Sequence, residues 1–155
     1  SKLKLYDDGV DANVILSAGL NDGVLCVHDM RTNKMVNWER IHSGAINMLE
    51  TSVSNMLITG SADKTLKQLD IMNGFKCIET MQTTDSVFCG EVFHNLAFVG
   101  WGDGNMLVYN LDNGECLYGY GVDNQGSVQC LKVLPQYQCV LAGGDSGTLL
   151  KVNFD

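Results

Sequence analysis

Three histidines, six cysteines and several aspartates are the residues of this sequence that could carry out chemistry. A catalytic triad or a metal site needs such groups at a recognised spacing. His28, His42 and His94 show no such spacing, and no two cysteines form a Cys-x-x-Cys pair. We therefore expect no catalytic residue, no metal site and no cofactor.

Two short segments have the composition of ligand-binding loops without their full pattern. The segment 7–11 is rich in aspartate, but it lacks the ligand spacing and the closing glutamate of a calcium loop. The segment 100–104 is rich in glycine, but no helix follows it, and a phosphate-binding loop needs one. Both segments are predicted to be turns.

Charge and cysteine usage bound the partners and the compartment. The net charge is -8 with ten lysines and arginines, too few for a nucleic-acid surface, so no direct nucleic-acid binding is expected. The sequence shows no signal peptide, no glycosylation acceptor and no apolar stretch near the ~20 residues of a membrane helix. We expect a cytoplasmic protein, with the nucleus as the alternative, and no membrane contact.

The elements that position these residues repeat along the chain. Four similar segments close at Asp29, Asp70, Asn110 and Asn153, with spacings of 41, 40 and 43 residues. A second register repeats every 41 residues and starts an alternating apolar pair each time, which predicts a strand with one buried face. Its members are Ile46, Val87 and Val128, with Leu5 a further 41 residues earlier.

Each repeat is predicted to hold four strands joined by hairpins. The second strands, 14–18, 56–59, 96–99 and 139–142, are apolar at consecutive positions and must be covered on both faces. Third strands are expected at 24–28, 66–69, 106–109 and 148–152, and fourth strands at 35–40, 76–81 and 115–120. Sheets stacked face to face around an axis satisfy this pattern, so each unit needs neighbours.

The second repeat resembles the WD-repeat family most. His42-Ser43-Gly44 precedes its first strand, and Thr59-Gly60-Ser61-Ala62-Asp63 leads to Leu69-Asp70. The resemblance implies a hydrogen-bonded support made by His42, by Thr59 or Ser61, and by Asp63, with Leu69 in place of the usual Trp. The histidine position reads Thr83 and Asn124 in the next two repeats, and the Trp position reads His28, Tyr109 and Val152 in the others.

The resemblance implies an all-β fold of β-propeller blades, each a four-stranded antiparallel sheet, that forms part of a larger ring. The expected blades are 1–40, 41–81, 82–122 and 123–155, the last lacking its outer strand. Such an incomplete ring is expected to self-associate or to borrow a strand. Trp38, in the outermost strand of the first unit, either packs on the next blade or makes a contact at the outer edge, and packing is the expected arrangement.

The function implied is a non-catalytic scaffold that binds protein or peptide partners. Two alternatives stay open: a propeller enzyme with a site in the channel, and a self-contained four-bladed structural propeller. A channel metal would need histidines or carboxylates on the innermost strands, where the sequence offers Asn47, Phe88 and Gln129.

The expected binding face combines the ends of the second strands with the loops between repeats. It comprises Leu20, Ser61 and Trp101 from the strand ends and His42, Asp85 and Gln125 from the loops. Trp101 is either an exposed anchor or a core residue packed on a neighbouring blade. Residues 82–155 hold eight acids and two bases, which favours a partner with basic residues around an apolar anchor.

The cysteines are predicted to be reduced and structural, because each lies in an apolar run where a thiol behaves as a small hydrophobe. They are Cys26, Cys77, Cys89, Cys116, Cys130 and Cys139. Alkylation under native, non-reducing conditions followed by mass spectrometry should find no intramolecular disulfide. A stable disulfide would overturn both the thiol prediction and the expected compartment.

Overall fold

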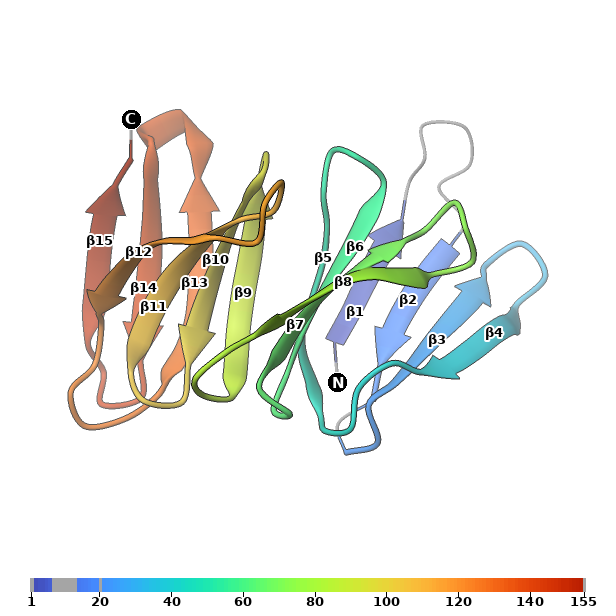
Figure 1. The fold of residues 1–155 in the computed structure, drawn as a ribbon, viewed down its shortest axis with the longest axis horizontal. Helices are drawn as coiled ribbons and strands as arrows, with labels where there is room; N and C mark the ends of the chain where they lie inside the picture. The colour runs from blue at the N-terminus through green and yellow to red at the C-terminus, as the bar shows by residue number, and fades with distance from the viewer. Residues whose placement is uncertain (1, 7–13, 20, 155) are drawn as a thin grey trace.

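The computed structural model describes residues 2–6, 14–19 and 21–154 (Figure 1). Within these ranges the chain forms strands β1 to β15 and a single 3-10 turn, η1 (Pro135–Tyr137), as the prediction of an all-β protein requires. No helix in the described ranges has the length and apolar character needed to cross a membrane.

The strands form four separate antiparallel sheets, each built from strands consecutive in the chain. The first sheet contains β1 (Lys2–Tyr6), β2 (Val14–Ala18), β3 (Val24–Asp29) and β4 (Lys34–Arg40). The second contains β5 (Ile46–Thr51), β6 (Met56–Ser61), β7 (Thr65–Asp70) and β8 (Lys76–Gln82). The third contains β9 (Val87–Phe93), β10 (Leu96–Trp101), β11 (Asn105–Asn110) and β12 (Cys116–Gly121). The fourth has three strands among the described residues, β13 (Val128–Leu134), β14 (Cys139–Gly144) and β15 (Leu149–Asn153).

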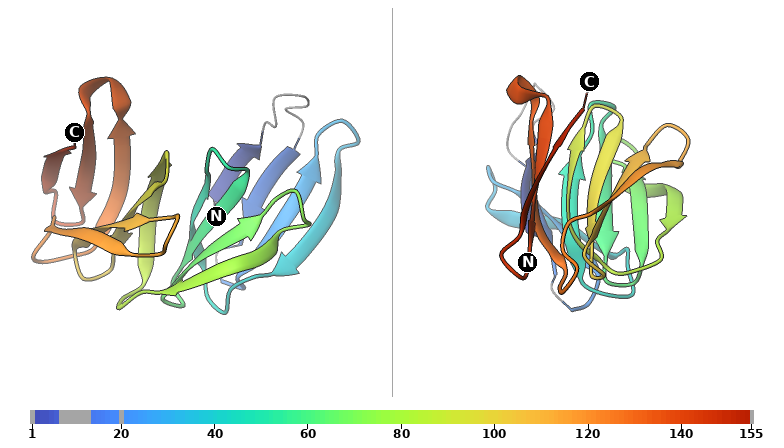
Figure 2. Two further views of the ribbon diagram at one scale, coloured as in Figure 1. Left: turned by 45° about the horizontal axis from the view of Figure 1, so that its top comes forward. Right: turned by 90° about the vertical axis from the view of Figure 1, so that its left-hand side faces the viewer.

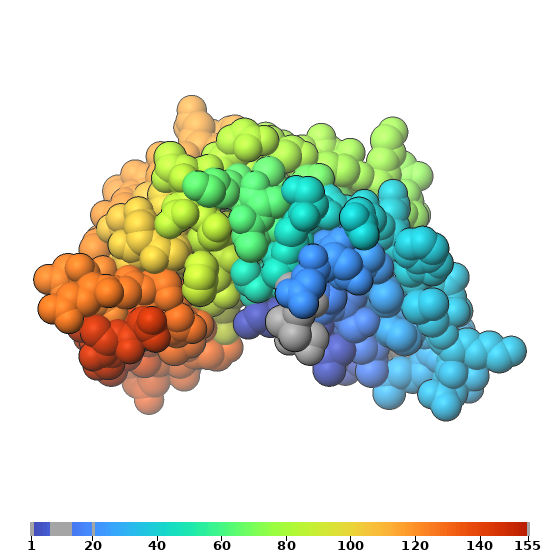
Figure 3. All heavy atoms as spheres, turned by 90° about the horizontal axis from the view of Figure 1, so that it is seen from below, coloured from blue at the N-terminus to red at the C-terminus, as the bar shows by residue number. Residues whose placement is uncertain are grey.

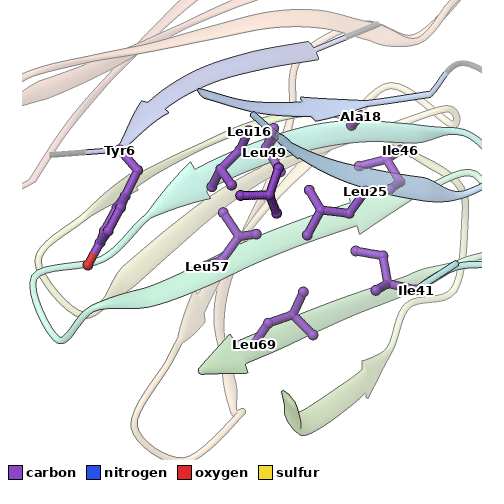
Figure 4. Close-up of a cluster of buried hydrophobic side chains, with 10 residues drawn as sticks. Tyr6, Leu16, Ala18, Leu25, Ile41, Ile46, Leu49, Leu57 and Leu69 are labelled. Atoms are coloured by element: carbon purple, nitrogen blue, oxygen red, sulfur yellow. The ribbon is translucent and has the colours of Figure 1, made fainter. Parts of the chain in front are cut away.

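The four sheets follow one another along an arc, with their faces turned toward their neighbours (Figures 2 and 3). The first strands lie on the inside of the arc, where β5 contacts β1 and β9, and β9 contacts β13. A separate apolar cluster fills each of the three spaces between sheets. In the first of these, Leu16 and Leu25 meet Leu49, Leu57 and Leu69 of the second sheet (Figure 4).

The middle strands differ in burial according to their neighbours. β6 and β10, whose sheets are flanked on both sides, are buried at five of their six positions. β2 and β14 belong to the two end sheets and alternate between buried and partly exposed positions over part of their length. A middle strand with consecutive apolar residues is therefore covered on both faces only where a sheet lies on each side of its own sheet.

The 41-residue register is confirmed for three first strands and wrong for one. Ile46, Val87 and Val128 each form the first pair of their strand, with Ser61, Trp101 and Gly144, and a bulge follows each pair. Leu5 instead pairs with Ile15 near the end of β1. Spacing failed here because more residues separate β1 from β2 than separate the first two strands of the other sheets.

Small residues near the ends of the second strands let adjacent sheets approach closely. A Cβ atom at Gly60 would lie 2.6 Å from Val87 Cγ1, and one at Gly100 would lie 2.7 Å from Val128 Cγ1. Each glycine thus accommodates the first residue of the following inner strand.

Two predictions about side-chain burial are wrong. Trp38 is 63% exposed, because no sheet in the described structure covers the face of the first sheet on which it lies. Cys77, Cys116 and Cys130 are exposed, whereas Cys89 and Cys139 are buried, so position in an apolar run did not predict burial. Cys26 is intermediate, and all six are unpaired.

The loops between sheets are tied to turns by backbone hydrogen bonds. The carbonyl groups of Gly23, Lys64 and Gly104 accept hydrogen bonds from the N–H groups of His42, Thr83 and Asp123, respectively. The three residues that supply these carbonyl groups have positive φ, between 66° and 86°. This left-handed conformation suits glycine best. At two of the three positions, Gly23 and Gly104, the residue is glycine and a loop carbonyl lies against it.

We predict that Gly104→Ala destabilises the protein more than Gly147→Ala does. Both glycines have φ near 85°, so both substitutions carry the left-handed strain of about 1–2 kcal/mol. At Gly104 the new Cβ would also overlap the carbonyl oxygen of Asp123, whereas nothing lies within 4 Å at Gly147. Urea unfolding followed by circular dichroism measures the difference, and equal midpoints would contradict the proposed tie.

Candidate functional site

The same end of all four sheets carries the segments that the sequence indicated as a binding face. It holds the turns after β2, β6, β10 and β14 and the loops before β5, β9 and β13; we call this end the rim. Ser61 and Trp101 end their strands there, and His42, Asp85 and Gln125 lie in the loops. Leu20 lies outside the described residues.

In the second sheet a buried network joins loop and turn. His42 Nε2 lies 2.8 Å from Thr59 Oγ1, and His42 Nδ1 lies 3.0 Å from Asp63 Oδ2. The Ser43 N–H donates to Asp63 at 2.9 Å, and the Thr65 hydroxyl donates to it at 2.6 Å. His42 and Thr59 are almost fully buried, so these bonds satisfy groups that water cannot reach. This is the arrangement that the family resemblance implied for His42, Thr59 and Asp63.

The network sets the ionisation of its two titratable members. Burial acts to raise the pKa of Asp63, but hydrogen bonds from Thr65, Ser43 and His42 outweigh it and lower the pKa from 3.8 to about 2. Burial lowers the pKa of His42, against the opposing effect of the Asp63 carboxylate. A neutral His42 beside an ionised Asp63 is therefore the favoured state near neutral pH.

A different side chain makes the equivalent connection in the fourth sheet. Asp123 accepts hydrogen bonds from the N–H groups of Gln125 and Ser146, at 2.9 and 2.7 Å, and these lower its pKa to about 2. Its own N–H is bonded to the Gly104 carbonyl, as that of His42 is to Gly23. Asp123, and not Asn124, thus occupies the histidine position, because the loop before β13 is one residue longer.

The aspartates in the turns after the second strands support their own turns. The Oδ1 atoms of Asp22, Asp63 and Asp103 accept the N–H two residues later at 3.2, 3.0 and 3.0 Å. The sheet lacking such an aspartate uses Asp123 of the loop instead.

Trp101 is a core residue and not an exposed anchor. It is 6% exposed and belongs to the cluster between the second and third sheets, with Ile58 and Leu66. Its Nε1 has no hydrogen-bond partner in the described structure. Ser61 and His42 are buried as well, so of the described candidates Asp85, partly exposed, and Gln125, exposed, can touch a partner directly.

Accessible carboxylates dominate the surface of the rim. Asp22, Asp103 and Asp145 are exposed, and Asp85 lies 3.8 Å from Lys64. Lys64 is the sole lysine or arginine in the described turns and loops of the rim. Between the third and fourth sheets, a cavity of about 490 Å³ opens here, with Asp103 and Asp123 in its wall. The rim is suited to cationic groups.

The histidines remain apart, each with a different neighbour. His28 Nε2 lies 3.0 Å from Ser17 Oγ, and the His94 ring packs edge-on against Phe93. No group of three or more His, Cys, Asp or Glu side chains with metal-site geometry occurs among the described residues.

We predict that Asp63→Asn lowers stability at pH 7 by about 1–3 kcal/mol, because a buried network loses its charged acceptor. The deficit should shrink as the pH falls from about 4 to 2, since the depressed pKa makes the stabilisation by Asp63 disappear there. Thermal melts at several pH values, with the exposed Asp145→Asn as control, test this. A deficit independent of pH would contradict the role of the carboxylate charge.

His42 adds a second pH dependence to the stability of the protein. Its lowered pKa means that the unfolded chain takes up a proton more readily, so stability should begin to fall below about pH 6.5.

No protein-family model and no curated protein matches the sequence. Among solved structures, the crystal structure of the computationally designed Ika4 protein is similar, with a TM-score of 0.79 and 20% sequence identity. The match covers 92% of this chain and 86% of the designed chain. At this identity the likeness concerns the fold alone.

Proposed function

We propose that the chain is a non-catalytic protein-interaction module, a segment of a WD-type β-propeller that binds a polypeptide partner at the rim. The blade assignment is supported by four successive antiparallel sheets along an arc and by the network of His42, Thr59 and Asp63. The cytoplasm, or the nucleus, remains the proposed compartment.

The observation that carries the binding proposal is the combination of a fixed rim with an acidic surface. Loops at the rim are tied to neighbouring turns by backbone bonds, and two sheets add a buried side-chain link through His42 or Asp123. Such preorganised loops lose little conformational entropy on binding. Asp85, Asp103 and Asp145 then favour a partner with basic residues.

A selection from a displayed random-peptide library against the immobilised protein tests the proposal. The enriched peptides should carry lysine or arginine around an apolar residue. The double variant Asp85→Lys and Asp145→Lys should weaken their binding about tenfold, since it reverses two rim charges.

The matched control reverses two exposed carboxylates at the opposite end of the third sheet, Asp112→Lys and Glu115→Lys. Fluorescence anisotropy should give the same affinity for this control as for the unmodified protein. Peptides that bind both double variants equally well would place recognition away from the rim.

A further inference from the structure

Two turns at the end of the sheets opposite the rim contain the same dipeptide, Asn-Gly. Asn73-Gly74 lies between β7 and β8, and Asn113-Gly114 lies between β11 and β12. Asparagine is a chemically labile residue. A following glycine favours its deamidation, because no side chain keeps the glycine amide nitrogen away from the asparagine side chain. On sequence alone the two turns are equivalent, so a difference in their reactivity must come from the structure.

The turn of the third sheet uses both reacting groups in hydrogen bonds. The Gly114 N–H donates to the Asn110 carbonyl at 2.9 Å. The Asn113 side chain accepts a bond from the Glu115 N–H at 3.0 Å and donates to the Glu115 carboxylate at 2.9 Å. A Cβ atom at Gly114 would lie 2.8 Å from Glu79 Oε1, so the second sheet lies against this turn. The amide nitrogen and the side chain that it would attack are both held in place.

The turn of the second sheet is one residue longer in the strand register, and this shifts the bond that closes it. Here the Phe75 N–H, and not the Gly74 N–H, donates to the Asp70 carbonyl, at 2.8 Å. Phe75 has a φ of 63°, close to the 70° of Gly114. Among the described residues, neither the Gly74 N–H nor the Asn73 side chain has a hydrogen-bond partner. Both residues are exposed, and nothing lies within 4 Å of a Cβ placed at Gly74.

We propose that Asn73 is a site of spontaneous deamidation in the folded protein and that the turn of the third sheet protects Asn113 from the same reaction. The Gly74 amide nitrogen loses its proton to solvent and attacks Asn73 Cγ. A bond from Cγ to this nitrogen forms, the bond from Cγ to Nδ2 breaks, and ammonia leaves. Water, the only co-reactant, then opens the cyclic imide at one of its two carbonyl groups. The products are aspartate, with an unchanged backbone, and isoaspartate, in which the chain runs through Cβ and Cγ.

The reaction changes a turn that supports the packing of two sheets. Asp70 Oδ1 accepts the N–H groups of Met72 and Asn73 at 3.0 and 3.2 Å, so the new carboxylate arises beside an existing one. Isoaspartate also lengthens the backbone within this turn by one carbon atom. Ile71 and Phe75 of the same turn pack against the apolar cluster between the first and second sheets. Conversion of Asn73 therefore disturbs residues that contact the core.

Incubation of the folded 155-residue protein at mildly alkaline pH tests the proposal. A glutamate-specific protease then releases peptides 51–79 and 92–115, and tandem mass spectrometry measures conversion of Asn73 and Asn113 in the same sample. Asn73 should convert at least about tenfold faster, because the hydrogen bonds of Asn113 and Gly114 must break before that site can react. Asn73→Gln keeps an exposed amide that cyclises slowly, and it should remove the conversion at this position.

Incubation in urea is the matched control. The unfolded chain has neither turn, so both asparagines should convert at similar rates there. Equal rates in the folded protein, verified as folded by circular dichroism, would overturn the proposal. The same ratio of rates in urea as in the folded protein would also overturn it, because the neighbouring residues and not the hydrogen bonds would then set the difference. Both turns lie opposite the rim, so either result leaves the rim proposal standing.

Discussion

Face-to-face burial of the middle strands is the constraint on which the rest of the structure depends. β6 and β10 are apolar on both faces, and neither could be stable in a sheet with one face in water. The packing of sheet on sheet removes both faces from solvent and forms three separate apolar clusters. Each sheet's stability therefore depends on its neighbours, and the two end sheets keep one face open.

Polar links at the rim then hold adjacent sheets in fixed positions relative to one another. The side chain that makes the link differs from sheet to sheet. In the second sheet a neutral histidine bridges Thr59 and an ionised Asp63. In the fourth sheet Asp123 alone bonds to the backbone of the turn. Both groups have the same effect, which is to join the loop before a sheet to the turn within that sheet by side-chain hydrogen bonds. The third sheet, with Thr83 at this position, keeps the backbone bond and turns its hydroxyl to the carbonyl of Asp85.

Periodicity in the sequence predicted the strands well, because alternating and continuous apolar runs are local properties. The strand positions and the register of Ile46, Val87 and Val128 came from spacing alone. Spacing failed where a loop changed length, which displaced Leu5 and assigned Asn124 a place that Asp123 holds. The exposure of Trp38 and the burial of Trp101 depend on which sheet faces them, and no local pattern encodes that.

The close contacts at Gly60 and Gly100 determine the curvature of the molecule. Where these glycines meet Val87 and Val128, the valine side chain packs directly on glycine backbone, so the side chain of one sheet alone separates the two sheets. Farther out, leucines, methionines and aromatic rings separate the same two sheets. Each pair of sheets is thus separated less on the inside than on the outside, which is consistent with the arched outline of the molecule (Figure 3). A single methyl group at either glycine would widen the inner side and straighten the arc.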